Sequence, residues 1–561
     1  MIRLLLGPLL RYVGEREATV WVEADAPCAV EVRAGEVTGA DRTFTVAGHH
    51  YAIVVMTGLE PGSSTPYEVT LDGETVWPLA GREQPPSRIR TIDPAKPMRL
   101  LVGSCREPPD PGTRPRRGLD PDVLDAYAVR MASQAHEEWP ELFLMIGDQV
   151  YADDTTTTVQ TFLRSRRDVS RPPKLEVADF EEYTRLYYES WGDPTIRWLL
   201  STIPSAMIFD DHDVRDDWNT SHAWRQDMQA TSWWEERVTG ALMSYWIYQH
   251  LGNLSPADLA ANETLRSIRA VEDGEAILRE FAQAADREAD GAKGTMWSYR
   301  RDFGRLRLLV IDSRCGRILA GGARSMVSDA EFAWIEKQVE GAPFDHLVVG
   351  TSLPWLLPRA LHDLESWDEA VAAGRHGRVM ARFGEWLRRA VDLEHWAAFR
   401  VSFDRLTALF GRVGRGDHGT TAPASICVVS GDVHHTYLSH ADYPDPTTSQ
   451  VYQVTCSPIH NTIPFVMRLV FRMGWSKTFE RFMHLFDGSA GVPPLPIRWH
   501  HPTGPLFGNA LALLVFDGRS ARLVFERSVR PRRRLPWRDD EGSKPGLAII
   551  DEKLLTDPSM K

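Results

Sequence analysis

Cysteine is scarce in this chain of 561 residues, and its five cysteines are widely spaced. They form no Cys-x-x-Cys pair, which argues against a disulfide scaffold and against a structural zinc knuckle. The odd number favours a reducing compartment, in which at least one thiol stays free for chemistry. We expect the cysteines other than Cys105 to be ordinary core residues. These are Cys28, Cys315, Cys427 and Cys456.

Long apolar runs are also missing. No stretch of 18 apolar residues occurs, so the sequence predicts no membrane-spanning helix. The apolar stretch at the N-terminus is broken by Gly7 and Pro8 and closed by Arg11. A signal peptide has a longer apolar region and a cleavage site of small residues. We therefore expect a cytoplasmic protein.

Positive charge is in deficit, with 64 Lys and Arg against 77 Asp and Glu and a net charge of −13. Because general nucleic-acid binding needs excess basic charge, we expect no nucleic-acid partner. A phosphate group can still be bound where metal ions supply positive charge at one point. The 43% apolar and 25% charged content excludes disorder, collagen and coiled coil and is typical of a soluble enzyme.

Residues 1–95 are predicted to form a small β-sandwich. Short runs with period-two alternation are separated by turn sequences such as Glu60-Pro61-Gly62. The segment 58–73 resembles the turn-then-tyrosine segment of fibronectin-III-like domains. A linker is expected at 93–97. The predicted strands are 18–23, 29–33, 51–56 and 67–71.

Residues 98–530 show apolar runs of strand length alternating with helical stretches such as 121–139 and 329–341. This alternation predicts an α/β fold with parallel strands, in which ligands gather at the carboxyl ends of the strands. The Trp-rich stretch 219–300 is predicted to be a helical insertion. The predicted strands are 98–105, 142–148, 206–213, 306–314, 346–354 and 426–434, followed by a closing hairpin at 510–518 and 520–528.

The C-terminal segment 531–561 has mixed charge and no periodicity, so we expect a solvated tail. The segment 461–488 is different, because Phe479, Phe482, Met483 and Phe486 fall on one face of a predicted helix. Gly474 separates this helix from an earlier apolar one. We expect a helical hairpin packed on the sheet; the alternative is a lid beside the site that offers an apolar wall to a lipid-like or aromatic ester.

Four motifs at the ends of predicted strands carry carboxylates, imidazoles or a thiol. A single Asp at a strand end often caps the next helix. Four such clusters converging in one crevice would repel one another, and metal ions are the economical way to hold them. The motifs are GSC with Cys105, GDQVYADD with Asp148 and Tyr151, FDDHDVRDD with Asp211 and His212, and SGDVHH with Asp432 and His434.

The ligand types narrow the choice of metal. Carboxylate and phenolate oxygens suit hard cations, imidazole suits borderline ones, and a thiolate suits a soft or oxidised transition metal. Two ions that share a bridging carboxylate would activate water as hydroxide for attack at phosphorus and clamp the oxygens of the displacement.

Taken in order, these motifs resemble the alkaline phosphatase D (PhoD-like) family of the calcineurin-like metallophosphoesterase superfamily. The family pattern is a first strand ending in Cys, GDxxYxD, DDHE/D, Ser-x-Pro and SGDVH, and all of it occurs within residues 98–435. The resemblance implies an α/β sandwich of two mixed sheets flanked by helices, preceded by the β-sandwich as an accessory domain. It also implies metal-dependent hydrolysis of phosphate esters, as a phosphomonoesterase, a phosphodiesterase or both.

The resemblance implies a role for each motif residue. Asp148 would bridge the two metals. Cys105, Tyr151 and His434 would hold the first metal, which is ferric iron in this family and in the related purple acid phosphatases. Both anionic donors, the thiolate and the phenolate, also suit ferric iron on chemical grounds.

For the second metal, the resemblance implies Asp211 and Asp432 as ligands. That metal is calcium in some family members, with manganese or zinc as alternatives. His212 would contact the phosphate and help to protonate the leaving group. The substrate would be a small-molecule phosphate ester or a phospholipid-like molecule.

The chain departs from the family pattern at two places. Asp216 and Asp217 stand where the family often has Asn, which leaves the ligand set of the second metal open. Val150 stands where some members have an Arg that holds phosphate, so the phosphate clamp must come from elsewhere, with Arg106 or Arg215 as candidates.

Other interpretations remain. GTSLP around Ser352 lacks the final Gly of a nucleophile elbow, so we expect a structural loop rather than a serine hydrolase. The functional alternatives are a phospholipase D-like phosphodiesterase, a non-catalytic phosphate-binding protein on the same fold, and a zinc hydrolase of non-phosphate esters or lactams. Four further histidines are expected to be surface or packing residues: His395, His460, His500 and His501.

Overall fold

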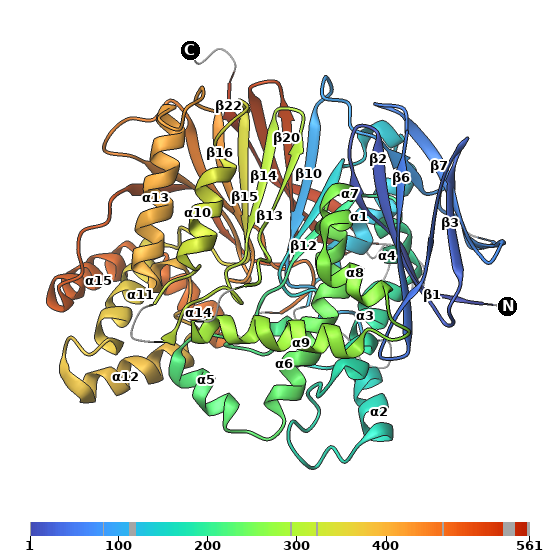
Figure 1. Ribbon diagram of the computed structural model, residues 1–561. Helices are drawn as coiled ribbons and strands as arrows, with labels where there is room; N and C mark the ends of the chain where they lie inside the picture. The colour runs from blue at the N-terminus through green and yellow to red at the C-terminus, as the bar shows by residue number, and fades with distance from the viewer. Residues whose placement is uncertain are drawn as a thin grey trace, which may run out of the picture.

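Two antiparallel sheets form an N-terminal β-sandwich, as the sequence predicted (Figure 1). The computed structural model describes residues 2–81, 83–110, 119–291, 294–320, 324–462, 465–530 and 545–557. One sheet contains β1 (Leu4–Val13), β2 (Glu17–Ala24), β6 (His49–Thr57) and β5 (Phe44–Val46) in that order. The other contains β4 (Val37–Arg42), β3 (Ala29–Ala34), β7 (Ser64–Leu71) and β8 (Glu74–Trp77), with β9 (Arg88–Arg90) paired to β7.

The first sheet of the sandwich is buried on both faces. Because side chains alternate along a strand, Val20 and Val22 of β2 pack inside the sandwich, whereas Trp21 joins the core of the following domain. Arg11 of β1 reaches the same way: its guanidinium is fully buried and donates hydrogen bonds of 2.7 Å to the carbonyls of Tyr248 and Gln249. The sandwich is therefore anchored to the α/β part.

The α/β part contains two mixed sheets, which confirms the predicted fold class. The first has the order β12 (Ser205–Ile208), β11 (Leu142–Ile146), β10 (Met98–Gly103), β20 (Ala510–Asp517), β21 (Ser520–Val529) and β22 (Gly546–Thr556). The second has the order β13 (Tyr299–Phe303), β14 (Leu306–Ile311), β15 (His346–Thr351), β16 (Ser425–Ser430), β18 (Gln450–Thr455), β17 (Thr436–Asp442) and β19 (Arg498–Leu506).

The central strands run parallel, and every side chain of β11, β14, β15 and β16 is buried. This explains why they read as continuous apolar runs rather than as alternating patterns. Their carboxyl ends lie at the same edge of the two sheets, where the acidic motifs follow them.

Helices cover the two sheets, and those between residues 219 and 300 form the predicted helical segment (Figure 1). Among the described residues no helix has both the length and the apolar content that a membrane crossing requires. The helices are α1 (Val123–Ser133), α2 (Thr157–Arg166), α3 (Phe180–Gly192), α4 (Pro194–Leu200), α5 (His222–Gln229), α6 (Trp234–Ser244), α7 (Pro256–Ala261), α8 (Glu263–Arg269), α9 (Glu275–Asp286), α10 (Asp329–Gln338), α11 (Arg359–Ala372), α12 (Gly377–Ala390), α13 (Arg400–Arg415), α14 (Phe465–Gly474) and α15 (Lys477–Ala490).

The C-terminal segment differs from the expected tail. Residues 546–556 form β22, which pairs antiparallel with β21 and extends the first sheet. Leu547, Ile550 and Leu555 of this strand contribute apolar contacts, with Leu555 buried. The charges at the start of the segment dominate its composition and hide this short strand, so the prediction of a solvated tail is wrong for residues 546–556.

The apolar segment after β18 forms two helices, α14 and α15, that pack against α11. Gly474 lies at the end of α14 where the two helices meet α11: a Cβ there would lie 2.6 Å from Leu361 Cγ. Met483 is buried, but Phe482 is 52% exposed, so the apolar face of α15 is only partly covered. The side chain of Phe486 lies outside the described residues.

Candidate metal centre

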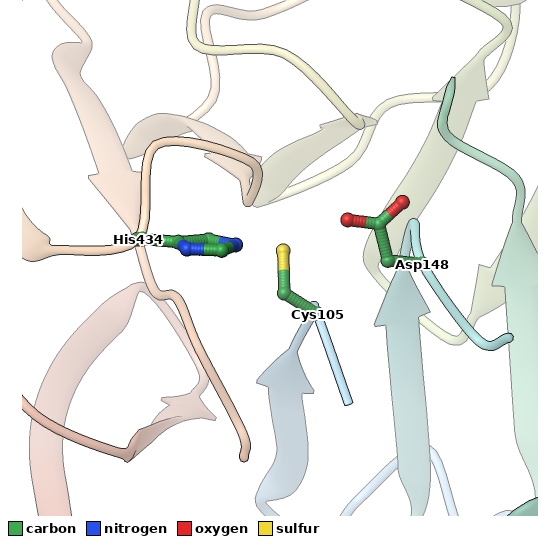
Figure 2. Close-up of side chains that lie close together, drawn as sticks. All are labelled: Cys105, Asp148 and His434. Atoms are coloured by element: carbon green, nitrogen blue, oxygen red, sulfur yellow. The ribbon is translucent and has the colours of Figure 1, made fainter. Parts of the chain in front are cut away.

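The ends of three strands bring Cys105, Asp148 and His434 together. Figure 2 shows the Cys105 sulfur, at the end of β10, pointing between the Asp148 carboxylate beyond β11 and the His434 ring beyond β16. One ligand atom of each residue lies within 4.8 Å of the other two. A thiol, a carboxylate and an imidazole at this separation form a donor set for a transition metal.

The backbone at these positions is itself unusual. Cys105, Asp148, Asp432 and His434 all have positive φ, between 48° and 66°, although none is glycine. Non-glycine residues rarely adopt this conformation, and such outliers cluster at functional sites. The tight turn after each strand therefore directs the side chain into the crevice at the cost of local strain.

A glycine makes the turn before Asp148 possible. Gly147 has φ of 86°, and a Cβ there would lie 2.6 Å from Asp210 Cβ. Only glycine allows the ends of β11 and β12 to approach this closely. The glycine of the GDQVYADD motif thus brings Asp148 next to the FDDHDVRDD motif.

A second cluster contains Asp210, Asp211 and Asp432, whose carboxylate oxygens also lie within 4.8 Å of one another. The buried guanidinium of Arg314 bonds to Asp210. Its Nη2 lies 3.2 Å from Asp211 Oδ1 and 3.4 Å from Asp432 Oδ1. Arg314 also bonds to Glu394, which pairs in addition with the buried Arg317 at 3.1 Å, so Arg314 contacts four carboxylates.

The positive charge of Arg314 does not balance the negative charge of the carboxylates in this region. Burial, followed by neighbouring carboxylates, raises the pKa of Asp148 well above its usual range, and burial also raises that of Asp211. Burial and the Asp148 carboxylate raise the pKa of the Cys105 thiol in the same way. Among the buried oxygens, Asp148 Oδ1, Asp210 Oδ2 and Asp211 Oδ1 accept no hydrogen bond. Unsatisfied buried oxygens that point into one crevice fit bound cations.

Tyr151 and His212 complete the predicted set. The Tyr151 hydroxyl lies 3.4 Å from Asp148 Oδ2 and accepts a hydrogen bond of 2.9 Å from the Asn461 amide. The His212 ring lies beside the Tyr151 ring, with centroids 4.8 Å apart, and one of its nitrogens joins a cluster with Asp148 and Asp211. All seven residues predicted from the motifs therefore lie around one crevice.

His212 is held by Asp153, whose carboxylate lies 2.9 Å from Nδ1. Burial lowers the pKa of His212, but the Asp153 carboxylate outweighs it and leaves that pKa well above its usual value. The pKa of Asp153 is correspondingly lowered to about 2, because His212 more than offsets its burial. An imidazolium in this position has a proton to donate.

His395 was expected to be a surface or packing residue, and this expectation is wrong. Its Nε2 lies 2.8 Å from Asp432 Oδ2, and its Nδ1 lies 2.6 Å from Glu365 Oε1. Residues that orient metal ligands from behind are typical of metal centres. His395 lies in an irregular stretch between α12 and α13, so no strand-end pattern marked it. Arg314 is the third residue after β14, so the strand-end pattern could have identified it.

Other predicted residues serve structural roles. Arg106 is buried and pairs with Asp122 at 2.8 Å, which leaves it unavailable as the phosphate clamp. Arg215 is partly exposed, lies 3.5 Å from Glu176 and stacks on the Trp233 ring. Ser352 is buried and donates a hydrogen bond of 3.1 Å to Asp210, as expected of a structural loop residue.

The two extra carboxylates of the FDDHDVRDD motif are close to the crevice. The backbone amide of Asp217 donates to Asp211 Oδ2 at 3.2 Å. Burial, with Glu394 next in importance, raises the pKa of Asp217 to about 9. Asp216 Oδ1 lies 3.9 Å from His212 Nε2. Asp217 thus borders the second cluster, and Asp216 lies beside His212.

Comparison with known proteins agrees with this geometry. The family model of the PhoD-like phosphatases matches residues 124–474, and a domain of unknown function (DUF7800) matches residues 1–89. A solved structure titled "Structure of PhoD" superposes with a TM-score of 0.57 at 12% identity, covering 99% of this chain and 91% of that one. No curated protein matches the sequence.

A purple acid phosphatase, PPD1 from yellow lupin (Lupinus luteus) seeds, also has a similar fold. It superposes with a TM-score of 0.50 at 11% identity, covering 93% of this chain and 71% of that one. The PhoD-like model spans more than half of the chain. The chain therefore belongs to the PhoD-like phosphatase family and is a metal-dependent phosphoester hydrolase.

Proposed function

We propose that the protein hydrolyses phosphodiesters, phospholipid-like diesters among them, and small phosphomonoesters, at a dinuclear centre. The observation that carries this proposal is the convergence of Cys105, Asp148 and His434 within 4.8 Å. With Tyr151 beside them, these residues would hold ferric iron, because thiolate and phenolate donors favour an oxidised transition metal. Asp148, Asp211 and Asp432 would hold calcium, or manganese or zinc in its place.

Metal ions bound there supply the positive charge that activates water and that neutralises the phosphoryl oxygens. His212 supplies the proton for the leaving group, because Asp153 holds its Nδ1 and keeps the ring protonated. Glu365 and His395 hold Asp432 in place from behind. Arg314 fixes Asp210 and Asp211 and limits the repulsion among the carboxylates.

The test compares p-nitrophenyl phosphate with bis-p-nitrophenyl phosphate, using the purified protein together with metal analysis. We expect hydrolysis of both, with iron and a divalent metal bound. Hydrolysis of the monoester alone would remove the diesterase part of the proposal. A folded, metal-loaded protein that turns over neither substrate would support the alternative of a phosphate-binding protein.

A further inference from the structure

Exposed apolar side chains gather on one group of helices. Of the twelve large apolar side chains that are exposed among the described residues, seven lie between residues 379 and 482. Helices α12, α14 and α15, which carry six of the seven, all pack against α11 (Figure 1). Scattered exposed apolar residues need no explanation, but a group of this kind marks an interaction surface. The seven are Val379, Phe383, Trp386, Val401, Leu469, Met473 and Phe482.

Helix α12 presents a continuous apolar stripe to solvent. Val379, Phe383 and Trp386 are 81%, 43% and 61% exposed and follow one another at helical spacing. The rings of Phe383 and Trp386 lie 5.8 Å apart. The other side of α12 is fixed to the protein: a Cβ on Gly384 would lie 3.0 Å from the Ala372 backbone nitrogen of α11. The stripe therefore points outward because of how the helix is packed.

Basic residues flank the apolar stripe. Arg378 and Arg382, one turn apart on α12, are exposed, and no described carboxylate forms an ion pair with either. The other two arginines of α12, Arg388 and Arg389, form ion pairs with Asp368, Glu385 and Asp227. Arg468 and Arg472 of α14 are exposed as well. Arg378 and Arg382 thus lie on the same helix as the exposed aromatic side chains of α12, whereas Arg468 and Arg472 stack on the Phe507 ring beside α14.

This surface borders the metal centre on two sides. Glu385 of α12 accepts a hydrogen bond of 2.5 Å from Ser221, which closely follows the FDDHDVRDD motif. On the other side, Trp475 directly follows α14 and its indole donates to His435 Nε2 at 3.3 Å, next to the predicted ligand His434. A molecule held against α12 and α14 would lie beside the crevice.

We propose that the surface formed by α12, α14 and α15 docks on anionic phospholipid bilayers and presents the metal centre to lipid headgroups. Aromatic and apolar side chains flanked by arginines suit the headgroup region, where the rings enter the acyl boundary and the guanidinium groups meet phosphates. A second copy of the chain is a poorer occupant, because a symmetric contact would oppose the arginines of one copy to those of the other. The proposed docking depends only on the features of this surface, whereas the presentation of headgroups to the metal centre also rests on the proposed function.

The experiment measures co-sedimentation of the metal-loaded, full-length protein with vesicles of two compositions. One set is an equimolar mixture of phosphatidylcholine and phosphatidylglycerol, and the other is pure phosphatidylcholine. We expect binding to the anionic vesicles that weakens with salt and is much weaker on the neutral ones. The triple variant Val379→Ser, Phe383→Ser and Trp386→Ser should bind about tenfold more weakly or worse, because it removes the inserted side chains.

A matched control replaces three equally exposed apolar residues elsewhere. Val271, Ile549 and Leu554 are 46%, 59% and 59% exposed, and their replacement by Ser should leave vesicle binding unchanged. Neither triple variant touches the metal centre, so both should keep wild-type turnover of p-nitrophenyl phosphate and a wild-type melting temperature.

Three results would overturn docking: no binding of the wild type to anionic vesicles, equal weakening by both triple variants, or self-association that the α12 variant abolishes. Analysis of the products formed from phosphatidylglycerol tests separately whether the metal centre acts on lipid headgroups. Vesicle binding without lipid cleavage, by protein that hydrolyses p-nitrophenyl phosphate, would refute headgroup presentation and leave docking standing. If the wild-type protein hydrolyses no soluble phosphate ester, that result would instead count against the proposed function.

Discussion

His395 Nε2 lies 2.8 Å from Asp432 Oδ2, while Glu365 Oε1 lies 2.6 Å from the other nitrogen of the same ring. The imidazole is thus held between two carboxylates and fixes the rotamer of Asp432. Burial raises the pKa of Asp432, but the hydrogen bond and charge of His395, with Arg314, more than offset it and leave that pKa well below its usual value. Asp432 is therefore oriented as an anion by residues behind it.

Replacing His395 by Ala should lower kcat by about 10- to 100-fold and reduce the content of the second metal, because Asp432 loses its orientation. Gln can still donate one hydrogen bond to Asp432, so His395→Gln should restore part of the activity. His500→Ala is the matched control, since that ring is 61% exposed on β19. Equal kcat in His395→Ala and wild type would show that the ring has no positioning role.

Asp153→Asn should change the pH profile of kcat. His212 can act as an acid only when it is protonated, so the rate falls as the pH rises through its pKa. Asp153 raises that pKa, and its replacement by a neutral amide should move the alkaline limb to lower pH. An alkaline limb at the same pH in both proteins would assign the limb to another group.

Cys105→Ala tests the identity of the first metal. Ferric iron with thiolate or phenolate ligands gives visible charge-transfer absorption, and loss of the thiolate should change the band and lower the iron content. Cys427→Ala, a buried cysteine in β16 away from the crevice, should leave both unchanged. A colourless, iron-free and fully active wild type would point to two divalent ions and return Cys105 to a packing role.

Arg314→Gln should destabilise the metal-free protein by about 3–5 kcal/mol, because it leaves buried carboxylates without their cation. Urea unfolding measures this change. Arg522→Gln removes an exposed pair with Glu552 and should cost about 1 kcal/mol or less. Similar free energies of unfolding for the two variants would mean that the carboxylates around Arg314 are neutral in the folded protein.

Much of the fold can be predicted from the sequence, because alternating apolar runs indicate half-buried strands and continuous short apolar runs indicate fully buried ones. The runs ending at Cys105 and Asp148 became β10 and β11, and the hairpin after Ala510 became β20 and β21. Strand β22 was missed, because Asp551, Glu552 and Lys553 interrupt its apolar residues and only its pairing with β21 reveals it as a strand. Local composition does not carry that information.

The site was predictable where its residues follow strands, because parallel strands place their carboxyl ends together. Asp148, Asp211 and Asp432 were found in this way. His395 was not, since tertiary packing alone brings its irregular segment to Asp432. Arg106 shows the converse: it is next to the predicted ligand Cys105 in sequence, but its side chain pairs with Asp122.

Asp148 is the residue shared by the two predicted metal sites, and we propose that it helps to hold metal where the reaction takes place. The most direct measurement is the metal content and phosphoester hydrolysis of Asp148→Asn, made on protein whose fold is checked by circular dichroism and thermal unfolding. We expect a folded protein with less bound metal and no turnover, because the variant loses a ligand charge and no core packing. A folded Asp148→Asn protein with wild-type metal content and near-normal hydrolysis would contradict this proposal.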